Sequence, residues 1–525
     1  MAEHPLDPIF NPRAVALVGV SSTQSGWGGG FHQAILDMGF DKEAVYPVNP
    51  KMQEISGLKC YPSLLDTPDP VDHVISLVPA HVVPDLVDQC IAKRVRSLHL
   101  FTAGFAETGD ERMVEMEREM VAKLRAAGIR AIGPNCMGLY VPGKLAFNRG
   151  FPVDAGNVFL LSQSGANAGQ IISGLARRGV RFSKAVSFGN GADLRAHDFF
   201  DYATSDPDTE VVIAYMEGIQ DGRKLVDAVK RCAAVKPTII LKGGLSAAGA
   251  RAANSHTASL AGSREIFEAL CRQAGAIRAE TMNDLLDLAV AVSTSAVRVN
   301  GRGVALIGGP GGFAVLSSDA IAAEGLDVPP MPDSVKQRLR EFIPVAGTSV
   351  NNPIDAQLRT PQQFDEGMRL IAAAEGIDVV FSTTFGGPWF QDNRPQEPQG
   401  DNDPDDQIQD QIQDPPQHPP QAARRGHGPF GAEGPPQISE EQAQRMAEEA
   451  ADRLAKLQDE TGIPFLVIQR GDMGMGGFDL SRGSANQVAA YGRGIAVMPD
   501  VPRAARVVRS MLEWRARREG LPEIF

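Results

Sequence analysis

The sequence predicts an α/β protein made of three consecutive parallel-sheet domains, with a disordered insertion in the third. Three observations predict this class. Short β-type apolar runs alternate with longer helical stretches, as in the βαβ units of parallel sheets. The alternation restarts twice, each time at an apolar run followed by a loop of small residues and a helix. A chain of 525 residues is also too long for one hydrophobic core, and its length alone suggests about three or four domains.

The first domain is expected over residues 1–147. It opens with the β-type run "AVALVGV", which contains Gly19, and passes through the loop "SSTQSGWGGG" into the helical stretch "FHQAILDMG". Further strand-like runs follow, separated by helical stretches: "AVYPVNP", "HVISLVP", "SLHLFTAG" and "IRAIGPN". A strand, a glycine-containing loop and a helix in this order are typical of a Rossmann-type nucleotide-binding unit.

The second domain is expected over residues 148–298 and the third over residues 299–525. The second opens with "GNVFLLSQSGANAGQIISGLARRG" and includes a loop that carries His256, and the third opens with "GRGVALIGGPGGFAVLSSDAIAAEG". The third is interrupted at residues 391–437, which are rich in Pro, Gln and Asp and nearly free of large apolar side chains. Because such a segment cannot bury enough surface to offset its ordering entropy, we expect it to be a disordered insertion.

Composition and charge exclude several classes of function. The formal net charge of −13 works against non-specific nucleic-acid binding, which needs a basic surface. No stretch approaches the roughly 20 apolar residues that span a bilayer, and the N-terminus lacks the pattern of an export signal. We therefore expect a cytoplasmic protein. The five cysteines are scattered without a C-x-x-C pair, which argues against a disulfide framework or a zinc site, and no metal site is predicted.

Three loops of small residues each follow a strand and precede a helix. The loop after Gly19 does not fit G-x-G-x-x-G in register, and the second strand ends in "YPVNPK" with no acidic residue to bind a ribose. A nicotinamide dinucleotide site is therefore disfavoured, whereas Lys51 suits a phosphate; the alternative is an ordinary turn and a surface lysine. The loops "FLLSQSGANAG" and "ALIGGPGGFAV" place backbone amides at helix N-termini, which bind anions. Two such loops suggest that a phosphoryl group is handled twice.

The second of these loops also resembles a nucleophilic-serine turn. However, "SQSG" does not satisfy G-x-S-x-G, and the sequence places no Asp and His partners for it. A serine hydrolase is therefore disfavoured.

His256 lies in the stretch "GARAANSHTASLAGSREIFEAL", on a loop with almost no apolar anchor. This setting favours a reachable histidine, which could attack a phosphoryl centre and carry the group as phosphohistidine. Such a histidine needs a carboxylate to fix its tautomer and stabilise the imidazolium. Glu217, in "YMEGI", follows an apolar strand where the strand would open into a site. The alternatives are an incidental histidine on a disordered surface loop and a surface glutamate at the end of a strand.

Taken together, the motifs resemble those of the NDP-forming acyl-CoA synthetases, a family related to succinyl-CoA synthetase, and most closely the α subunits of its ADP-forming acetyl-CoA members. The resemblance covers most of the chain outside the insertion. These motifs fall in the family's order: "VALVGVSS", "YPVNPK", "FTAGFAE", "GPNCMGL", "LSQSGA", "SFGN", "YMEGI", "SHTASLAG", "GGPGG" and "NNPIDA".

The resemblance implies a Rossmann-type domain that binds coenzyme A, followed by two flavodoxin-type domains. It implies that His256 is the phosphorylated histidine and that Glu217 is its carboxylate partner. The implied CoA-binding residues are Gly19, Ser21, Ser22, Asn49, Lys51, Val78 and Pro79. The implied phosphate-binding residues are Ser162, Gln163, Ser164 and Gly165 at one helix start, and Gly309, Gly311 and Gly312 at another.

The resemblance also implies the reaction. An acyl-CoA and phosphate give an acyl phosphate, His256 takes the phosphoryl group, and ADP accepts it; in reverse, a carboxylic acid, CoA and ATP give an acyl-CoA. Two departures from the family pattern stand out. Ala258 replaces a glycine that is frequent in the family's "SHTGS" loop, and no ATP-grasp segment is found in the sequence. We therefore expect ATP or ADP, with magnesium, to bind to a separate ATP-grasp β subunit, in a hetero-oligomer with this chain.

Two other functions compete with this ligase. The first is a non-catalytic regulator that binds CoA or acyl-CoA, which Ala258 and the missing ATP-grasp segment favour. The second is a Rossmann oxidoreductase, which rests on fold analogy alone.

Overall fold

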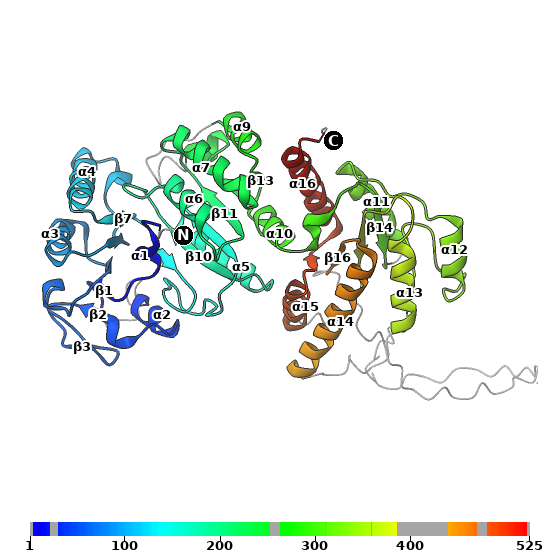
Figure 1. Ribbon diagram of the computed structural model, residues 1–525, viewed down its shortest axis with the longest axis horizontal. Helices are drawn as coiled ribbons and strands as arrows, with labels where there is room; N and C mark the ends of the chain where they lie inside the picture. Colours follow the sequence, from blue (N-terminus) through cyan, green and yellow to red (C-terminus); the bar gives the residue numbers. More distant parts are fainter. Residues whose placement is uncertain are drawn as a thin grey trace, which may run out of the picture.

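The computed structural model describes residues 4–21, 30–251, 263–309, 311–356, 358, 360–385, 439–469 and 480–521. Within these residues, three mainly parallel sheets follow one another along the chain, and Figure 1 shows them side by side from the blue to the red end. The predicted fold class is confirmed. Ser22, His256, Ala258 and the insertion expected at 391–437 lie outside the described residues.

The first unit is a parallel sheet whose strands are almost entirely buried, because helices cover both of its faces. The helix α4 begins where the side chain of its N-cap residue Asp110 accepts a hydrogen bond from the backbone N–H of Arg112. The strand order is β2 (Val45–Val48), β1 (Val15–Val18), β5 (His73–Ser76), β6 (Ser97–Leu100) and β7 (Arg130–Ile132). The helices are α2 (Phe31–Asp37), α3 (Val83–Lys93) and α4 (Glu111–Ala126), and a small hairpin pairs β3 (Glu54–Ile55) with β4 (Leu58–Lys59).

The second unit is a six-stranded sheet with one antiparallel edge strand, β8, which lies before residue 147 and pairs with β10. The last residues of the first expected domain, 1–147, therefore belong to the second sheet. The strand order is β13 (Ile277–Ala279), β12 (Thr238–Lys242), β11 (Val211–Met216), β9 (Val158–Ser162), β10 (Phe182–Ser187) and β8 (Gly138–Tyr140). The helices are α5 (Gly165–Ala176), α6 (Ala196–Ser205), α7 (Gly222–Val235), α9 (Arg264–Ala274) and α10 (Met282–Val292).

The third unit is a parallel sheet in the order β14 (Val304–Ile307), β15 (Val379–Ser382), β16 (Phe465–Ile468) and β17 (Ala496–Met498). On the other side of β14, Ile354 forms a parallel bridge with Ile307. The helices are α11 (Gly311–Ala323), α12 (Asp333–Arg340), α13 (Pro361–Ala372), α14 (Glu440–Thr461), α15 (Leu480–Gly492) and α16 (Val501–Glu519).

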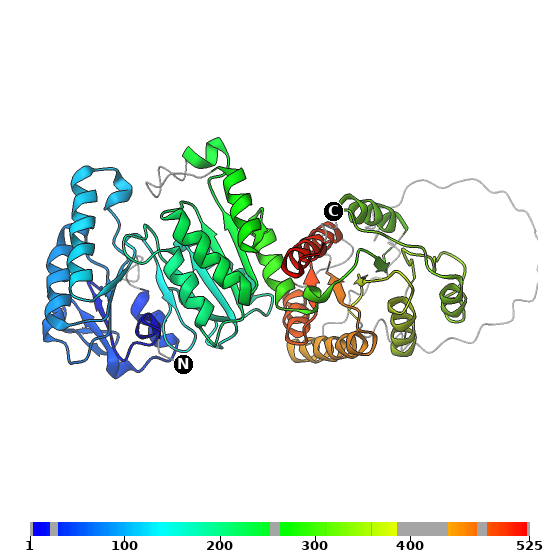
Figure 2. The same cartoon turned by 45° about the horizontal axis from the view of Figure 1, so that its top comes forward.

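A continuous apolar core joins the three units. Near the N-terminus, Phe10 of α1 (Asp7–Phe10) stacks on Tyr202 of α6, with ring centroids 4.5 Å apart. Near the C-terminus, α16 packs on α10 of the second unit, and Figure 2 shows these red and green helices side by side. The chain ends therefore tie neighbouring units together.

A buried carboxylate reinforces the contact between the second and third units. Asp287 of α10 is 1% exposed and accepts hydrogen bonds from Arg178 at 2.6 Å and from two nitrogens of Arg503 at 2.6 and 2.7 Å. We predict that Asp287→Ala lowers the free energy of unfolding by about 3 kcal/mol, because it leaves two guanidinium groups without their shared partner. Urea denaturation measures this loss. Asp365→Ala, which breaks a half-exposed pair with Arg453, should cost less than about 1 kcal/mol, and equal losses in the two variants would contradict the prediction.

Two buried histidines predict a loss of stability in acid. The rings of His73 and His99 are stacked, 6.2 Å apart, and each residue is 1% exposed. Burial and the neighbouring His99 lower the pKa of His73 to about 3, and burial lowers the pKa of His99 to about 4. Above about pH 6.5, the ordinary pKa of histidine in the unfolded chain, these histidines are neutral in both the folded and the unfolded protein. Between that pH and the lowered pKa of the folded protein, only the unfolded chain takes up the protons. The free energy of unfolding should therefore fall as the pH drops from 6.5, by about 2 kcal/mol per histidine at pH 5.

Urea denaturation at pH 7.5 and pH 5 tests this prediction. Replacing His73 should reduce the difference between the free energies of unfolding at pH 7.5 and pH 5, and an unchanged difference in that variant would rule out the explanation.

Candidate active site

Each of the three sheets has the same arrangement around its first parallel strand. In the first sheet, β1 lies between β2, the next strand along the chain, and β5, which follows later. In the second sheet, β9 lies in the same way between β10, the next strand, and β11. In the third sheet, β14 lies between the bridge at Ile354 and β15. The loops at the carboxyl ends of strands that diverge in this way form the crevice where open α/β sheets bind ligands. The loops predicted to bind CoA and phosphate follow these first strands.

In the first unit, the crevice brings Gly19 against Val78. Gly19 follows β1, has φ of +91°, and donates its N–H to the carbonyl of Val48 at 2.9 Å. A Cβ at this position would lie 2.7 Å from Cγ1 of Val78 and 3.0 Å from the carbonyl carbon of Leu77. Only glycine fits both this backbone conformation and this close approach.

Asn49 joins the same crevice from the neighbouring strand. Its side-chain amide donates to the carbonyl of Val20 at 2.8 Å, and its Oδ1 accepts the backbone N–H of Lys51 at 2.9 Å. This turn leaves Lys51 exposed to solvent, as a phosphate-binding lysine requires. Pro79 is exposed beside Val78, and Ser21 is partly exposed at the end of the described loop. The described residues of the predicted CoA set thus all follow the carboxyl ends of the neighbouring strands β1, β2 and β5.

In the second unit, a strand and a helix meet at the residues predicted to bind phosphate. Ser162 ends β9 and Gly165 begins α5. Ser164 caps that helix, because its side chain accepts the N–H of Asn167, and the hydroxyl of Ser162 donates to the carbonyl of Ser164 at 2.6 Å. The loop is therefore held so that the N-terminus of α5, its positive end, faces the crevice.

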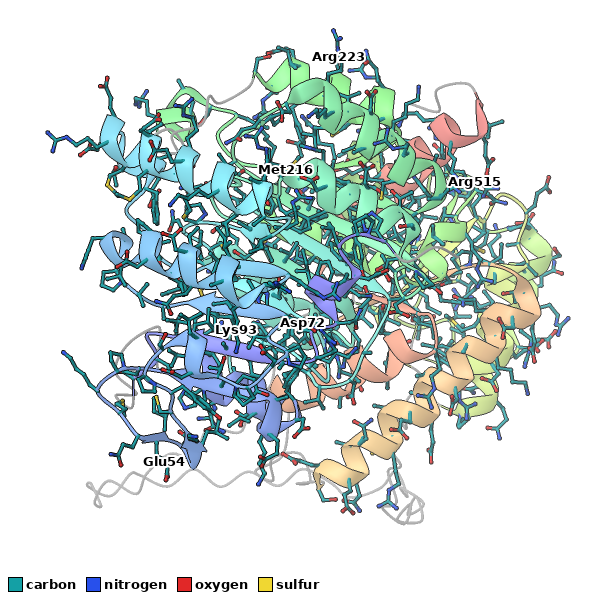
Figure 3. The ribbon with its side chains drawn as sticks, turned by 60° about the vertical axis from the view of Figure 1, so that its left-hand side comes forward. Glu54, Asp72, Lys93, Met216, Arg223 and Arg515 are labelled. Carbon is teal, nitrogen blue, oxygen red and sulfur yellow. The ribbon has the colours of Figure 1, made fainter. Side chains whose placement is uncertain are left out.

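Gln163 connects this loop to Glu217 across the crevice. The side-chain Oε1 of Gln163 accepts the backbone N–H groups of Glu217 at 2.8 Å and of Gly218 at 2.9 Å. The backbone N–H of Gln163 donates to the carbonyl of Tyr215. Met216, the last residue of β11 and labelled in Figure 3, is buried, and Glu217 directly follows it. Glu217 is only 8% exposed. The structure thus brings together Gln163 and Glu217, which the sequence predicts separately.

Two further side chains hold Glu217, and sequence analysis does not single them out. The hydroxyl of Tyr215 donates to the carboxylate of Glu217 at 3.1 Å, and Nζ of Lys242 donates to its main-chain carbonyl at 2.5 Å. Burial raises the pKa of Tyr215 above its usual range, and the charge of Glu217 adds to this rise. Burial lowers the pKa of Lys242, while Glu217 opposes that shift. A lysine that ends a strand of apolar residues was the available signal for Lys242.

In the third unit, the crevice brings the glycine loop after β14 against Thr383. Gly308 has φ of +93°, and a Cβ there would lie 2.1 Å from the hydroxyl oxygen of Thr383. Gly309 also has a positive φ, and Gly311 and Gly312 form the exposed first turn of α11. As in the second unit, a loop of small residues after a strand leads directly into a helix, whose N-terminus lies at the carboxyl end of the sheet.

The segment that carries His256 leaves the second sheet close to Glu217. It follows β12, which is paired with β11 so that Lys242 lies opposite Met216, and the N–H of Gly243 donates to the carbonyl of Met216. The described chain resumes at Ser263, which caps α9. His256 therefore belongs to a segment anchored next to Glu217 at its start.

Metal and membrane signals are absent from the described part of the chain. It holds no group of three or more His, Cys, Asp or Glu side chains placed to bind a metal ion. None of the helices described is both long and apolar enough to cross a membrane.

Comparison with known protein families gives three matches in chain order. A CoA binding domain matches residues 13–142, a succinyl-CoA ligase like flavodoxin domain matches residues 155–292, and a ligase-CoA domain matches residues 304–382.

Among curated proteins, the chain is 37% identical over 390 residues to the Pyrococcus furiosus protein named acetate–CoA ligase (ADP-forming) II subunit alpha. This match covers 73% of the present chain and 84% of that subunit. The chain is also 35% identical over 381 residues to the Archaeoglobus fulgidus protein named acetate–CoA ligase (ADP-forming) I, over 72% of its own length and 54% of the relative's. It thus spans about half the length of that relative.

Among solved structures, the chain is similar to acetyl-coenzyme A synthetase 1 of Ca. Korarchaeum cryptofilum, described as a complex with phosphate and ADP. The TM-score is 0.72 at 28% sequence identity, and the match covers 98% of this chain and 97% of the other. With this agreement in fold, and with 84% of a 37% identical relative covered, the chain belongs to the family of NDP-forming acyl-CoA synthetases that includes the ADP-forming acetate–CoA ligases.

Proposed function

We propose that this chain is the α subunit of an NDP-forming acyl-CoA ligase and that it carries the acyl transfer and phosphohistidine steps. One observation carries the proposal. Glu217 is buried at the carboxyl end of β11, its backbone N–H donates to Gln163 at the start of α5, and it lies next to the segment that holds His256. A carboxylate, a helix N-terminus and a histidine loop are what phosphoryl transfer through histidine requires.

The proposed chemistry has two displacements in this chain. A phosphate oxygen attacks the thioester carbon of an acyl-CoA; the carbon–sulfur bond breaks, and the thiolate leaves as CoA after taking up a proton. A nitrogen of His256 then attacks the phosphorus of the acyl phosphate; the phosphorus–oxygen bond to the acyl group breaks, and the carboxylate leaves. In the last step phosphohistidine passes its phosphoryl group to ADP, and the whole sequence is reversible.

Each group of residues has a role in this scheme. Glu217 orients the imidazole of His256 and stabilises its positive charge while the phosphoryl group is transferred. The loop of Ser162, Gln163, Ser164 and Gly165 holds the phosphate, and the loop of Gly309, Gly311 and Gly312 holds it near the nucleotide. Gly19, Ser21, Ser22, Asn49, Lys51, Val78 and Pro79 bind CoA. The family matches fall within the three domains proposed at 1–147, 148–298 and 299–525, which supports this division of labour.

We further propose that a separate ATP-grasp β subunit supplies the nucleotide, with magnesium. Two observations support a partner: three of the similar proteins are named as alpha subunits, and the chain spans about half of the longer relatives. On this view the native protein is a hetero-oligomer.

Phosphate-dependent release of CoA from acyl-CoA tests the proposal without the partner. The purified chain is mixed with short, branched or aromatic acyl-CoA and inorganic phosphate, and the free thiol is measured with a thiol reagent. We expect close to one thiol released per chain with at least one acyl group, and none without phosphate. CoA binding by calorimetry with no phosphate-dependent thiol release would instead favour the non-catalytic regulator.

A further inference from the structure

A hydrogen-bonded cluster outside the predicted site joins the first and second units. Its centre is Asn190, which is 6% exposed in the loop after β10. The side-chain amide of Asn190 donates to Glu107 at 2.6 Å and to Glu117 at 3.2 Å, and both carboxylates belong to the first unit. Glu107 in turn accepts the backbone N–H groups of Gly104 and Phe105. One amide therefore holds the loop after β6 against the second sheet.

The backbone of Asn190 is held from two more directions. Its N–H donates to the carbonyl of Pro134, in the segment that joins the first two sheets, at 3.0 Å. Its carbonyl accepts the side-chain amide of Gln220 at 3.3 Å. Since Gln220 lies three residues after Glu217, Asn190 contacts the loop of the proposed catalytic carboxylate.

The same contacts continue to the proposed CoA site. The loop after β6 includes Thr102, whose hydroxyl donates to the carbonyl of Val78 at 2.7 Å. Hydrogen bonds and short stretches of chain thus run from Val78 through the Thr102–Glu107 loop and Asn190 to Gln220 and Glu217.

The electrostatics of the cluster show what the Asn190 amide contributes. Burial raises the pKa of Glu117, and the nearby charge of Glu107 adds to this rise. Asn190 donates to both carboxylates and so offsets their repulsion. Its Oδ1 is buried without a hydrogen-bond partner among the described residues, a cost that a residue placed only for packing would not carry.

We propose that Asn190 is a positioning residue that couples occupancy of the CoA crevice to the position of the Glu217 loop. This inference rests on the proposed function, because it takes CoA as the ligand of the first crevice. CoA binding orders the loops at Val78 and Thr102, and Asn190 passes this order to Gln220 and Glu217. The acyl-phosphate site is then fully assembled only when the thioester carrier is in place.

Hydrogen exchange of the full chain with and without CoA tests this coupling. In the wild type, we expect CoA to slow amide exchange in two regions, residues 77–79 at its own crevice, where Leu77 and Val78 carry the amide hydrogens, and residues 217–220 at the other. Coupling between sites usually amounts to about fivefold or more, so we expect at least that slowing at residues 217–220. In Asn190→Ala, CoA should still protect residues 77–79, whereas the protection of residues 217–220 is lost.

Two further variants make the outcome decisive. Asn157→Ala is the matched control, because Asn157 also donates to a carboxylate, Glu210, but at the amino end of the second sheet; it should keep the wild-type response. Gln220→Ala replaces an exposed residue and removes its hydrogen bond to the carbonyl of Asn190. It should weaken the protection of residues 217–220 by CoA, and it provides the test even if Asn190→Ala does not fold. Protection of residues 217–220 that persists in Asn190→Ala or Gln220→Ala, or is missing in the wild type, overturns the inference. Lack of protection at residues 77–79 in the wild type rejects the proposed CoA site itself.

Discussion

Glu217→Gln should slow the transfer of the phosphoryl group to His256, in a reaction with acyl-CoA and phosphate, by about 10²- to 10⁴-fold. The substitution keeps the size of the side chain but removes the negative charge that would orient His256 and stabilise its imidazolium form. The backbone bonds from Glu217 and Gly218 to Gln163 do not involve the replaced atoms, so the loop should keep its shape. The rate at which radiolabel from phosphate appears on the protein in a single turnover measures the effect, and CoA affinity measured by calorimetry should not change.

Glu210→Gln is the matched control for this variant. Glu210 is an exposed glutamate at the opposite end of the same strand, β11, and pairs with Asn157. It should react at the wild-type rate. A Glu217→Gln protein that is as fast as the control would show that this carboxylate takes no part in the chemistry.

Gly19→Ala should weaken CoA binding by about 10- to 100-fold. The new Cβ would lie 2.7 Å from Val78 and 3.0 Å from the backbone of Leu77, so the loops that line the crevice must move apart. The residue would also have to keep a φ of +91°, which costs about 1–2 kcal/mol for a residue with a Cβ. Displacement of binding groups by about 1 Å can cost about 10²-fold. Calorimetric titration with CoA measures the loss.

Gly39→Ala separates the two causes. Gly39 has a similar φ of +87°, but a Cβ there has no neighbour within 4 Å. This control should lose a comparable amount of stability and bind CoA normally. If Gly19→Ala also binds CoA normally, the crevice between β1 and β5 is not the CoA site.

The sequence predicts the fold class well because its signals are local. The apolar runs at β1, β9 and β14, each followed by small residues and a helix, are short-range patterns, and the structure has strands and helices at these places. Sheet order depends instead on contacts between distant segments. The antiparallel edge strand β8 illustrates this, since three residues that begin with Gly138 carry little pattern, and their pairing with β10 depends on the second sheet being formed.

In the candidate site, too, single residues could be predicted from the sequence, whereas the contacts between them could not. Gly19, Gln163, Glu217 and Gly309 are predicted because loops after strands carry a recognisable composition. The contacts between them come from which strands are neighbours, and sequence patterns do not contain that information. Lys242 and Asn190 were missed for this reason, because Lys242 contacts Glu217 from the neighbouring strand and Asn190 contacts Glu107 of the first unit. Tyr215 lies only two residues before Glu217, and its contact with that carboxylate was also missed.

We propose above all that His256 carries the phosphoryl group. The direct measurement is incubation of the purified chain with acyl-CoA and radiolabelled phosphate, alone and with an ATP-grasp partner, followed by scoring of acid-labile, base-stable label on the wild type and on His256→Asn. We predict about one label per wild-type chain, dependent on acyl-CoA, and none on His256→Asn. Equal labelling of the two proteins, or no label on a chain that binds CoA, would contradict the claim.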